Sequence, residues 1–148
     1  LLEAAEFYRR HIRHVFTVNT LAYLIKGGRL SKWKGNLAEA LDMKPVLIVD
    51  EAGSLQVLKT VRGHKKSLKS LVEYAQENGV EIEKQLFSVC HGEDEEAMDF
   101  VLDLLREKLH PADIMVSVVG CAIGAHTGRG LVGVCFLDAS EEPYRKYL

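Results

Sequence analysis

Apolar segments typical of strands alternate with amphipathic segments typical of helices along most of the chain, and this alternation strongly constrains the fold. Two of the predicted strands are separated by Asp50-Glu51-Ala52-Gly53, which predicts a β-hairpin turn. Neighbouring strands joined by a hairpin are antiparallel, which excludes a purely parallel sheet. We therefore expect an α/β fold, a two-layer sandwich in which a mixed sheet carries helices packed mainly on one face.

The remaining elements are predicted from apolar spacing and from turn residues. Strands are expected at 15–18, 46–49, 54–61, 86–90, 114–119 and 131–137, and helices at 1–12, 21–26, 31–41, 68–78 and 97–110. The strand at 114–119 is expected to be buried. The glycine-rich stretch 120–130 is predicted to be a loop between two strands, and the residues after 138 to form a polar tail that is frayed apart from Tyr144 and Tyr147.

Composition excludes several classes of protein. The 148 residues are 47% hydrophobic and 27% charged, with a net charge of −2, which gives no drive towards nucleic acid or an anionic membrane. No apolar run approaches the roughly 20 residues that span a bilayer. Cys90, Cys121 and Cys135 lie in apolar contexts and form no CxxC pair. We therefore expect all three cysteines to be reduced core residues of a cytoplasmic protein, and we expect no metal site.

The segment 20–30 combines a short amphipathic helix with Gly27, Gly28 and Arg29. The two glycines can adopt positive φ and turn the backbone sharply, so Arg29 projects from a rigid turn. Its planar fork of donors suits a carboxylate or a phosphate. The alternative is a helix C-cap that happens to be followed by a surface arginine.

Four glycines occur among residues 120–130, with His126 and Thr127 at the expected tip of the loop. Backbone amides in such a loop can approach a ligand closely. The stretch lacks the Gly-Lys-Ser/Thr ending of a P-loop, and a strand is expected where a dinucleotide fingerprint needs a helix. Arg29 and His126 together can form a carboxylate site, although spacing does not show whether they meet. The alternative is a tight connection with an incidental histidine.

Other polar residues give weaker indications of a functional site. The acidic run 93–96 is expected to complement the positive end of the following helix rather than to bind metal. Cys90 and His91 are neighbours on a strand and point to opposite faces, which disfavours a catalytic pair. His11 and His14 have no third ligand nearby in the sequence. The basic cluster of Arg62 and residues 64–66 is either a docking patch or a solvated face.

Four separated motifs together resemble the DegV family. They read Leu-Ala-Tyr-Leu-Ile-Lys-Gly-Gly-Arg-Leu at 21–30, Met-Lys-Pro-Val-Leu at 43–47, Lys-Thr-Val-Arg-Gly at 59–63 and Gly-Ala-His-Thr-Gly at 124–128. The resemblance implies three parts: a helical lead-in at 1–13 from a preceding N-terminal domain, a lipid-binding C-terminal domain at 14–138, and a polar tail at 139–148. The first residue, Leu1, falls within a helical pattern and is not methionine, which fits a segment of a longer protein.

The resemblance also implies a function. Family members bind a long-chain fatty acid in a buried apolar tunnel, use no cofactor, and in some cases present the carboxylate to a partner fatty-acid kinase rather than act as enzymes themselves. Arg29, His126 and Thr127 are then expected to hold the carboxylate, with loop contacts from Gly28, Gly124, Gly128 and Arg129. The implied tunnel residues are Leu24, Trp33, Leu37, Leu41, Val46, Ile48 and Val118.

The resemblance leaves some matters open. Arg129 stands where the family pattern usually has proline, and it adds a charge that can engage a carboxylate, a phosphate or a partner. A rival hypothesis is an enzyme that uses Arg29, His126 and Arg129 on a phosphorylated small molecule. The length of the acyl chain and the identity of a kinase are not indicated. An isolated half of a two-domain protein can also expose apolar surface and form a homodimer.

Overall fold

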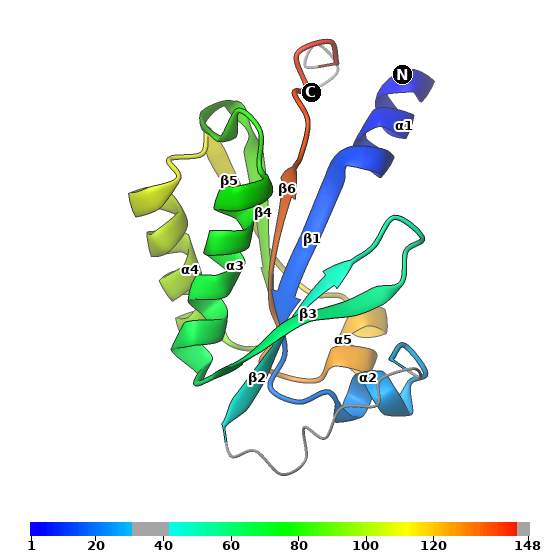
Figure 1. Cartoon of the computed structure of the whole chain (residues 1–148), viewed down its shortest axis with the longest axis vertical. Helices are drawn as coiled ribbons and strands as arrows, with labels where there is room; N and C mark the ends of the chain where they lie inside the picture. Colours follow the sequence, from blue (N-terminus) through cyan, green and yellow to red (C-terminus); the bar gives the residue numbers. More distant parts are fainter. Residues whose placement is uncertain (31–41, 145–148) are drawn as a thin grey trace.

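The computed structural model describes residues 1–30 and 42–144 (Figure 1). The helices are α1 (Leu2–His11), α2 (Ala22–Lys26), α3 (His64–Asn78), α4 (Glu95–Lys108) and α5 (Cys121–Thr127), with a 3₁₀ turn at Ile82–Lys84. The strands are β1 (Ile12–Thr17), β2 (Met43–Val49), β3 (Leu55–Arg62), β4 (Leu86–His91), β5 (Asp113–Val118) and β6 (Val132–Leu137). The expected helix at 31–41 lies outside the described residues.

The strands form one mixed sheet in the order β3-β2-β1-β6-β4-β5. β4 and β5 are parallel, and the other four neighbouring pairs are antiparallel. The hairpin predicted around residues 50–53 is confirmed as the connection between β2 and β3. The predicted α/β fold with a mixed sheet is therefore confirmed, and β1 and β6 lie at its centre.

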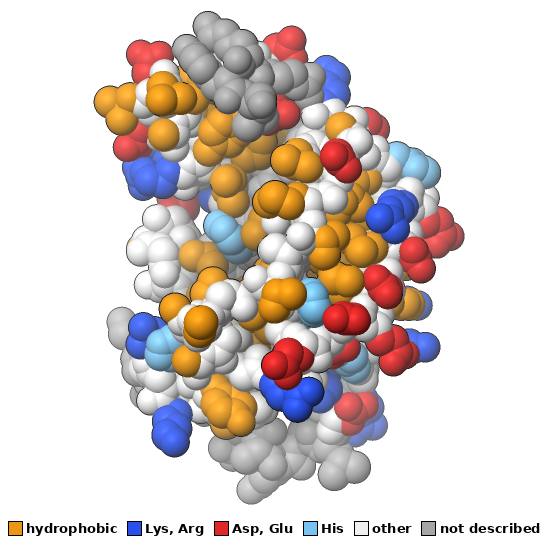
Figure 2. Space-filling view, turned by 180° about the vertical axis from the view of Figure 1, so that it is seen from behind, with side chains coloured by type: hydrophobic (Ala, Val, Ile, Leu, Met, Phe, Trp, Pro, Cys, Tyr) orange, Lys and Arg blue, Asp and Glu red, His pale blue; other side chains and the backbone are white. Residues whose placement is uncertain are grey.

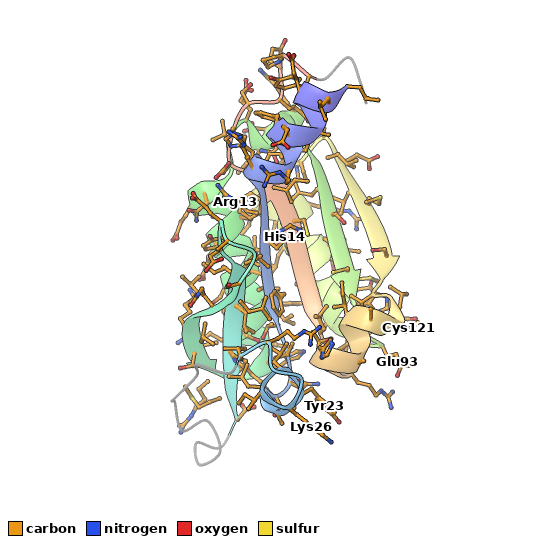
Figure 3. The ribbon with its side chains drawn as sticks, turned by 90° about the vertical axis from the view of Figure 1, so that its right-hand side faces the viewer. Arg13, His14, Tyr23, Lys26, Glu93 and Cys121 are labelled. Carbon is orange, nitrogen blue, oxygen red and sulfur yellow. The ribbon has the colours of Figure 1, made fainter. Side chains whose placement is uncertain are left out.

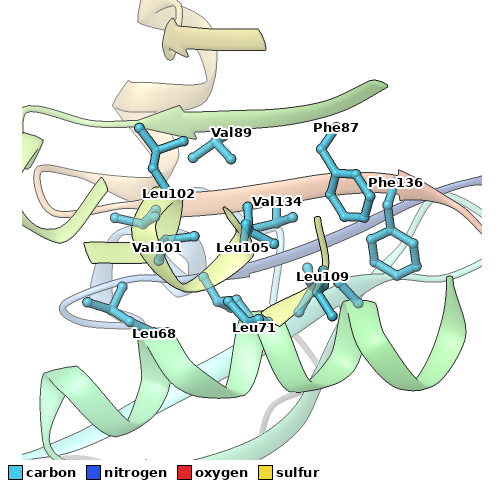
Figure 4. Packing of buried hydrophobic residues seen from close by; sticks show 14 of the residues in the cluster. Leu68, Leu71, Phe87, Val89, Val101, Leu102, Leu105, Leu109, Val134 and Phe136 are labelled. Carbon is cyan, nitrogen blue, oxygen red and sulfur yellow. The ribbon is translucent and has the colours of Figure 1, made fainter. Parts of the chain in front are cut away.

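Helices α3 and α4 cover one face of the sheet and enclose the larger core (Figures 1 and 4). Leu68 and Leu71 of α3 pack with Leu105 of α4 against the sheet, and all three side chains are buried. The rings of Phe87 and Phe136 stack between neighbouring strands, with centroids 5.9 Å apart. The 3.6-residue spacing of apolar residues on these helices explains why one face of each is buried.

The opposite face of the sheet carries only short helices among the described residues. α2 and α5 lie together at one end of it, and α1 leads into β1 at the other (Figures 1 and 3). A smaller cluster that includes Val18, Leu24 and Leu131 holds α2 to the sheet, and α5 packs against α2. Within residues 1–30 and 42–144 no helix covers most of this second face, which we call the open face, and the site described below lies on it.

Two expectations about exposure are wrong. β5 is an edge strand rather than a buried one, and Met115, Val116 and Val118 are 53%, 43% and 65% exposed. Figure 2, which views the molecule from the β5 side, shows hydrophobic side chains running down its middle. Cys121 is exposed at the start of α5, whereas the other two cysteines are half-buried in the sheet. A strand's apolar sequence does not tell an edge position from a central one.

The described part of the tail, up to Tyr144, is packed rather than frayed. Glu141 is buried and accepts a hydrogen bond from the hydroxyl of Tyr8, and the ring of Tyr144 lies 4.8 Å from that of Phe7. Asp138, where the tail begins, pairs with both His11 and Arg13. The tail therefore closes against α1. No helix in the described residues is long and apolar enough to cross a bilayer.

Candidate functional site

A cavity of about 450 Å³ lies on the open face of the sheet, beside α2 and α5. Its floor is made by one face of the three central strands and comprises His14 and Phe16 of β1, Cys90 of β4, and Gly133 and Cys135 of β6. Leu24 and Arg29 line it from α2 and the following turn, and Val49 and Leu55 from the β2–β3 hairpin. The volume falls within the range typical of small-molecule sites.

The turn after α2 brings Arg29 and His126 together. Gly27 has a φ of −78°, but a side chain there would start 2.2 Å from Nδ1 of His126, so the imidazole packs directly on the Gly27 backbone. Arg29 Nη1 donates a hydrogen bond of 2.7 Å to the carbonyl oxygen of Gly27. Both side chains line the cavity. The sequence offered no spacing from which this meeting could be derived.

The sequence predicted a loop at 120–130, and this is wrong in part, because residues 121–127 form α5. Gly120 precedes the helix, and Gly128, with a φ of +71°, ends it. His126 and Thr127 therefore lie on the last turn of a helix. The Thr127 hydroxyl is buried and donates to the carbonyl oxygen of Ile123 at 3.0 Å, so it is directed into its own helix.

The α5 glycines and Arg129 face a second cavity of similar volume, on the other side of α5. Tyr23, Glu93, Cys121, Gly124, Gly128 and Arg129 contribute to its lining. Arg129 Nε pairs with Glu93 Oε2 at 2.6 Å, and both side chains are largely exposed. Figure 3 shows Glu93 and Cys121 on the side of α5 away from His14. Arg129 is thus separated from Arg29 and His126, and Gly28 is absent from the linings of both cavities.

Burial changes the pKa of several groups in the floor. It lowers the pKa of His14, and the charge of Arg13 lowers it further. The His14 side chain still reaches solvent through the cavity's open side. Burial raises the pKa of Cys90, and burial together with Cys90 raises that of Cys135 to about 12. The floor is therefore uncharged at neutral pH. Among residues 1–30 and 42–144 no group of three His, Cys, Asp or Glu side chains could hold a metal ion.

An apolar cavity with an arginine and a histidine at one end suits an amphipathic acid. A family model described as an uncharacterised protein of the DegV family matches residues 1–139. The chain belongs to the DegV family. A DegV domain-containing protein of Clostridium perfringens is 35% identical over 130 residues, which are 88% of this chain and 45% of that protein. The chain spans about half the length of the curated DegV relatives it matches.

Solved DegV structures share the fold. A fatty acid binding DegV family protein from Streptococcus agalactiae is 30% identical with a TM-score of 0.74, and the match covers 87% of this chain and 45% of that one. The fatty acid kinase B3 protein of Streptococcus pneumoniae, solved with linoleic acid, has a TM-score of 0.82 at 22% identity, covering 93% and 48% of the two chains. At that identity the likeness shows the fold alone.

The tunnel residues implied by the DegV resemblance are dispersed in the structure. Leu24 lines the cavity. Val46 lies in the core against α3 and α4, and Ile48 packs against that core. Val118 is exposed on β5 and lines the second cavity. Trp33, Leu37 and Leu41 lie outside the described residues.

Sequence reasoning did not select the floor of the cavity. Its members alternate with core residues along β1 and β6, so Phe16 faces the cavity while Val15 belongs to the larger core. The alternation of cavity and core residues along each strand was the signal that could have identified the floor, because alternate residues of a strand point to opposite faces. Strands buried on both faces read as continuous apolar runs, which hides which face holds a ligand.

Proposed function

We propose that this chain binds a long-chain fatty acid on the open face of its sheet, with the carboxylate at Arg29 and His126 and the acyl chain along the floor. The observation that carries this proposal is the convergence of the two side chains at Gly27, at one end of a cavity whose remaining lining is mainly apolar. Fatty acid binding by the S. agalactiae DegV protein supports the same ligand class.

The proposed role is binding rather than catalysis. Each buried methylene of an acyl chain contributes about 0.8 kcal/mol, so an apolar floor and one charged anchor suffice for retention. The cysteines of the floor stay protonated at neutral pH and are poor nucleophiles. The Thr127 hydroxyl is directed to Ile123, which makes its predicted contact with the carboxylate secondary to those of Arg29 and His126.

We further propose that the longer protein presents the bound carboxylate to a kinase. Arg29 is exposed, so an acid held there lies at the rim of the cavity rather than beneath it. The S. pneumoniae protein of the same fold is the B3 protein of a fatty acid kinase. A carboxylate at the rim can be reached by a second protein while the acyl chain stays against the floor of the cavity. The compartment expected from the sequence, the cytoplasm, is where such a kinase would find ATP.

The test is native mass spectrometry of the purified chain, followed by solvent extraction and identification of any bound acid. We expect a long-chain fatty acid on the wild type and little or none on Arg29→Ala. Lys26→Ala is the matched control, because it removes the same charge three residues earlier, at a side chain outside the cavity lining (Figure 3).

Two outcomes would contradict the proposal. The first is an empty wild type that also fails to take up palmitic acid in titration calorimetry. The second is equal loss of the ligand in Arg29→Ala and Lys26→Ala, which would mean that general positive charge, and not the Arg29 site, retains the acid.

A further inference from the structure

Gly133 is an unusual residue for the centre of a sheet. It lies on β6, directly opposite Phe16 of β1 and Cys90 of β4, and it is buried. Glycine weakens a strand interior and often marks a place where something approaches the backbone closely. A Cβ at this position would lie 3.1 Å from the Cys90 sulfur and 3.3 Å from Cβ of Phe16. The space above Gly133 is therefore narrow and is kept open by the missing side chain.

The residues beside Gly133 extend this narrow space into a channel. Cys90 and Cys135 lie on the same face of β4 and β6 and are small and half-buried. We call Cys90, Gly133 and Cys135 the β6 trough. Larger side chains lie beside it, Phe16 on the same floor and Leu24 from α2. Because the trough thiols are neutral, the trough presents sulfur and backbone, and no charge, to whatever lies in it.

The trough has a direction. Leu131, beside α2 and α5, lies at the end near Arg29 and His126, and Cys135 pairs with His14 at the other end. Strands rise about 3.4 Å per residue, so the floor from Leu131 to Cys135 is roughly 14 Å long. Figure 3 places His14 on β1 well away from Tyr23 and Lys26 of α2. Gly133 stands midway between the anchoring end and the far end.

We propose that the acyl chain lies in the β6 trough and crosses Gly133, and that the absence of a side chain at Gly133 admits the distal half of a long chain. This inference rests on the proposed function and adds a residue that selects for chain length. A side chain at Gly133 closes the trough midway, so a long acid loses the contacts of its methyl-terminal half. An acid short enough to end before Gly133 keeps all of its contacts.

The first experiment compares palmitic acid with octanoic acid by titration calorimetry. In Gly133→Ala and Gly133→Val we expect the affinity for palmitic acid to fall at least about tenfold, because several methylenes lose their contacts. The affinity for octanoic acid is expected to change less than about threefold. Gly120→Ala is the matched control, because a Cβ there meets nothing within 4 Å, its φ of −67° suits alanine, and Gly120 lies outside the lining of the first cavity.

The second experiment needs no mutation. Wild-type chain is treated with excess N-ethylmaleimide at about pH 8 with and without palmitic acid, and the rate at which each cysteine is labelled is followed by peptide mass spectrometry, because the protonated trough thiols react slowly even without the acid. We expect bound acid to protect Cys90 and Cys135, which lie in the trough, and to leave Cys121 equally reactive in both samples. Cys121 is an internal control because it is exposed and faces the second cavity.

The outcomes separate this inference from the proposed function. If palmitic acid binds but protects Cys121 instead of the trough thiols, the acyl chain lies in the second cavity, and the inference fails while fatty acid binding stands. The inference also fails if folded Gly133→Val binds palmitic acid as tightly as the wild type. If the wild type binds neither acid, the proposed function itself is overturned.

Discussion

Gly27 and Gly28 shape one turn through different properties of glycine. Gly28 has a φ of +73°, a conformation that residues with a side chain adopt at a cost, and its Cβ position is otherwise free. Gly27 has an ordinary φ but lies against the His126 ring. The first property controls the path of the chain to Arg29, and the second controls where the imidazole lies.

Gly27→Ala is therefore expected to weaken fatty acid binding about tenfold or more while the fold persists, because the new methyl group displaces His126 from the cavity. Gly28→Ala is expected to lower the free energy of unfolding by about 1 kcal/mol through backbone strain. Titration calorimetry and urea unfolding of both variants separate the two effects. Equal binding by Gly27→Ala and wild type would show that the His126 position is unimportant.

His14 predicts a dependence of stability on pH. Its pKa in the folded chain lies below the ordinary 6.5, because burial and then Arg13 disfavour the charged form. The unfolded chain therefore binds a proton at His14 at a higher pH than the folded chain does. The contribution of His14 to stability is complete above about pH 6.5 and is lost as pH falls through the lower folded pKa.

When the pH is lowered from about 7.5 to about 5, we expect the free energy of unfolding to fall less in His14→Gln than in the wild type. Urea unfolding at several pH values measures the difference. Parallel curves for the two proteins would mean that His14 titrates alike in the folded and unfolded chains.

At the scale of elements, α5 shows how close packing can make a helix from a glycine-rich stretch. Seven residues are too few for a helix that is stable alone, so α5 depends on its contacts with α2. A Cβ at Gly128 would lie 2.7 Å from the Tyr23 ring, and Gly27 allows the equally close approach of His126. The sequence showed four glycines and predicted a loop. The close packing of Gly128 on Tyr23 and of Gly130 on Asn19 involves partners far away in the sequence.

The N-terminus of α4 was better predicted, because its signal is local. Asp94 accepts a hydrogen bond of 3.2 Å from the backbone N–H of Ala97, and Glu95 and Glu96 follow in the first turn. The acidic run thus lies at the positive end of the helix, as expected. Asp94 also lies 3.4 Å from Nε2 of His64, at the start of α3.

Asp94→Ala is expected to lower the free energy of unfolding by about 1 kcal/mol, the usual effect of losing an N-cap. Asp103→Ala on the same helix is the control, because its side chain is 82% exposed and its pairing with Arg106 contributes little. Urea unfolding compares them. A similarly small change in the free energy of unfolding of both variants would contradict the capping role of Asp94.

At the scale of the molecule, hydrophobic periodicity and the hairpin signal were enough to predict an α/β sandwich with a mixed sheet. They could not predict strand order, because nothing local in Ile114–Val118 distinguishes an edge strand from a buried one. Motif reasoning selected Arg29 and His126, and the structure places both in the lining of one cavity, while their contact with a ligand stays a prediction. Val46 and Ile48 were assigned to the tunnel on the strength of apolar character that core and cavity residues share.

The exposed β5 edge predicts self-association of this chain at high concentration. Unpaired edge strands with apolar side chains pair with other chains, and β5 has three such exposed residues. We expect sedimentation velocity to show a concentration-dependent dimer that Val116→Lys weakens. Leu58→Lys, at a similarly exposed residue of the opposite edge strand β3, is the control. A monomer at every concentration would contradict this expectation.

The central position of β1 and β6 also sets the order of events during synthesis. Of the six described strands, β1 leaves the ribosome before the other five and β6 after them, yet Ile12 pairs with Leu137 and Thr17 with Val132. The hairpin of β2 and β3 can form early, but the sheet cannot close until its final strand emerges. Contacts between such distant residues slow folding, because a long loop must close first. Until β6 is synthesised, the edge of β1 that pairs with it stays unpaired, and we expect a chaperone to cover that edge.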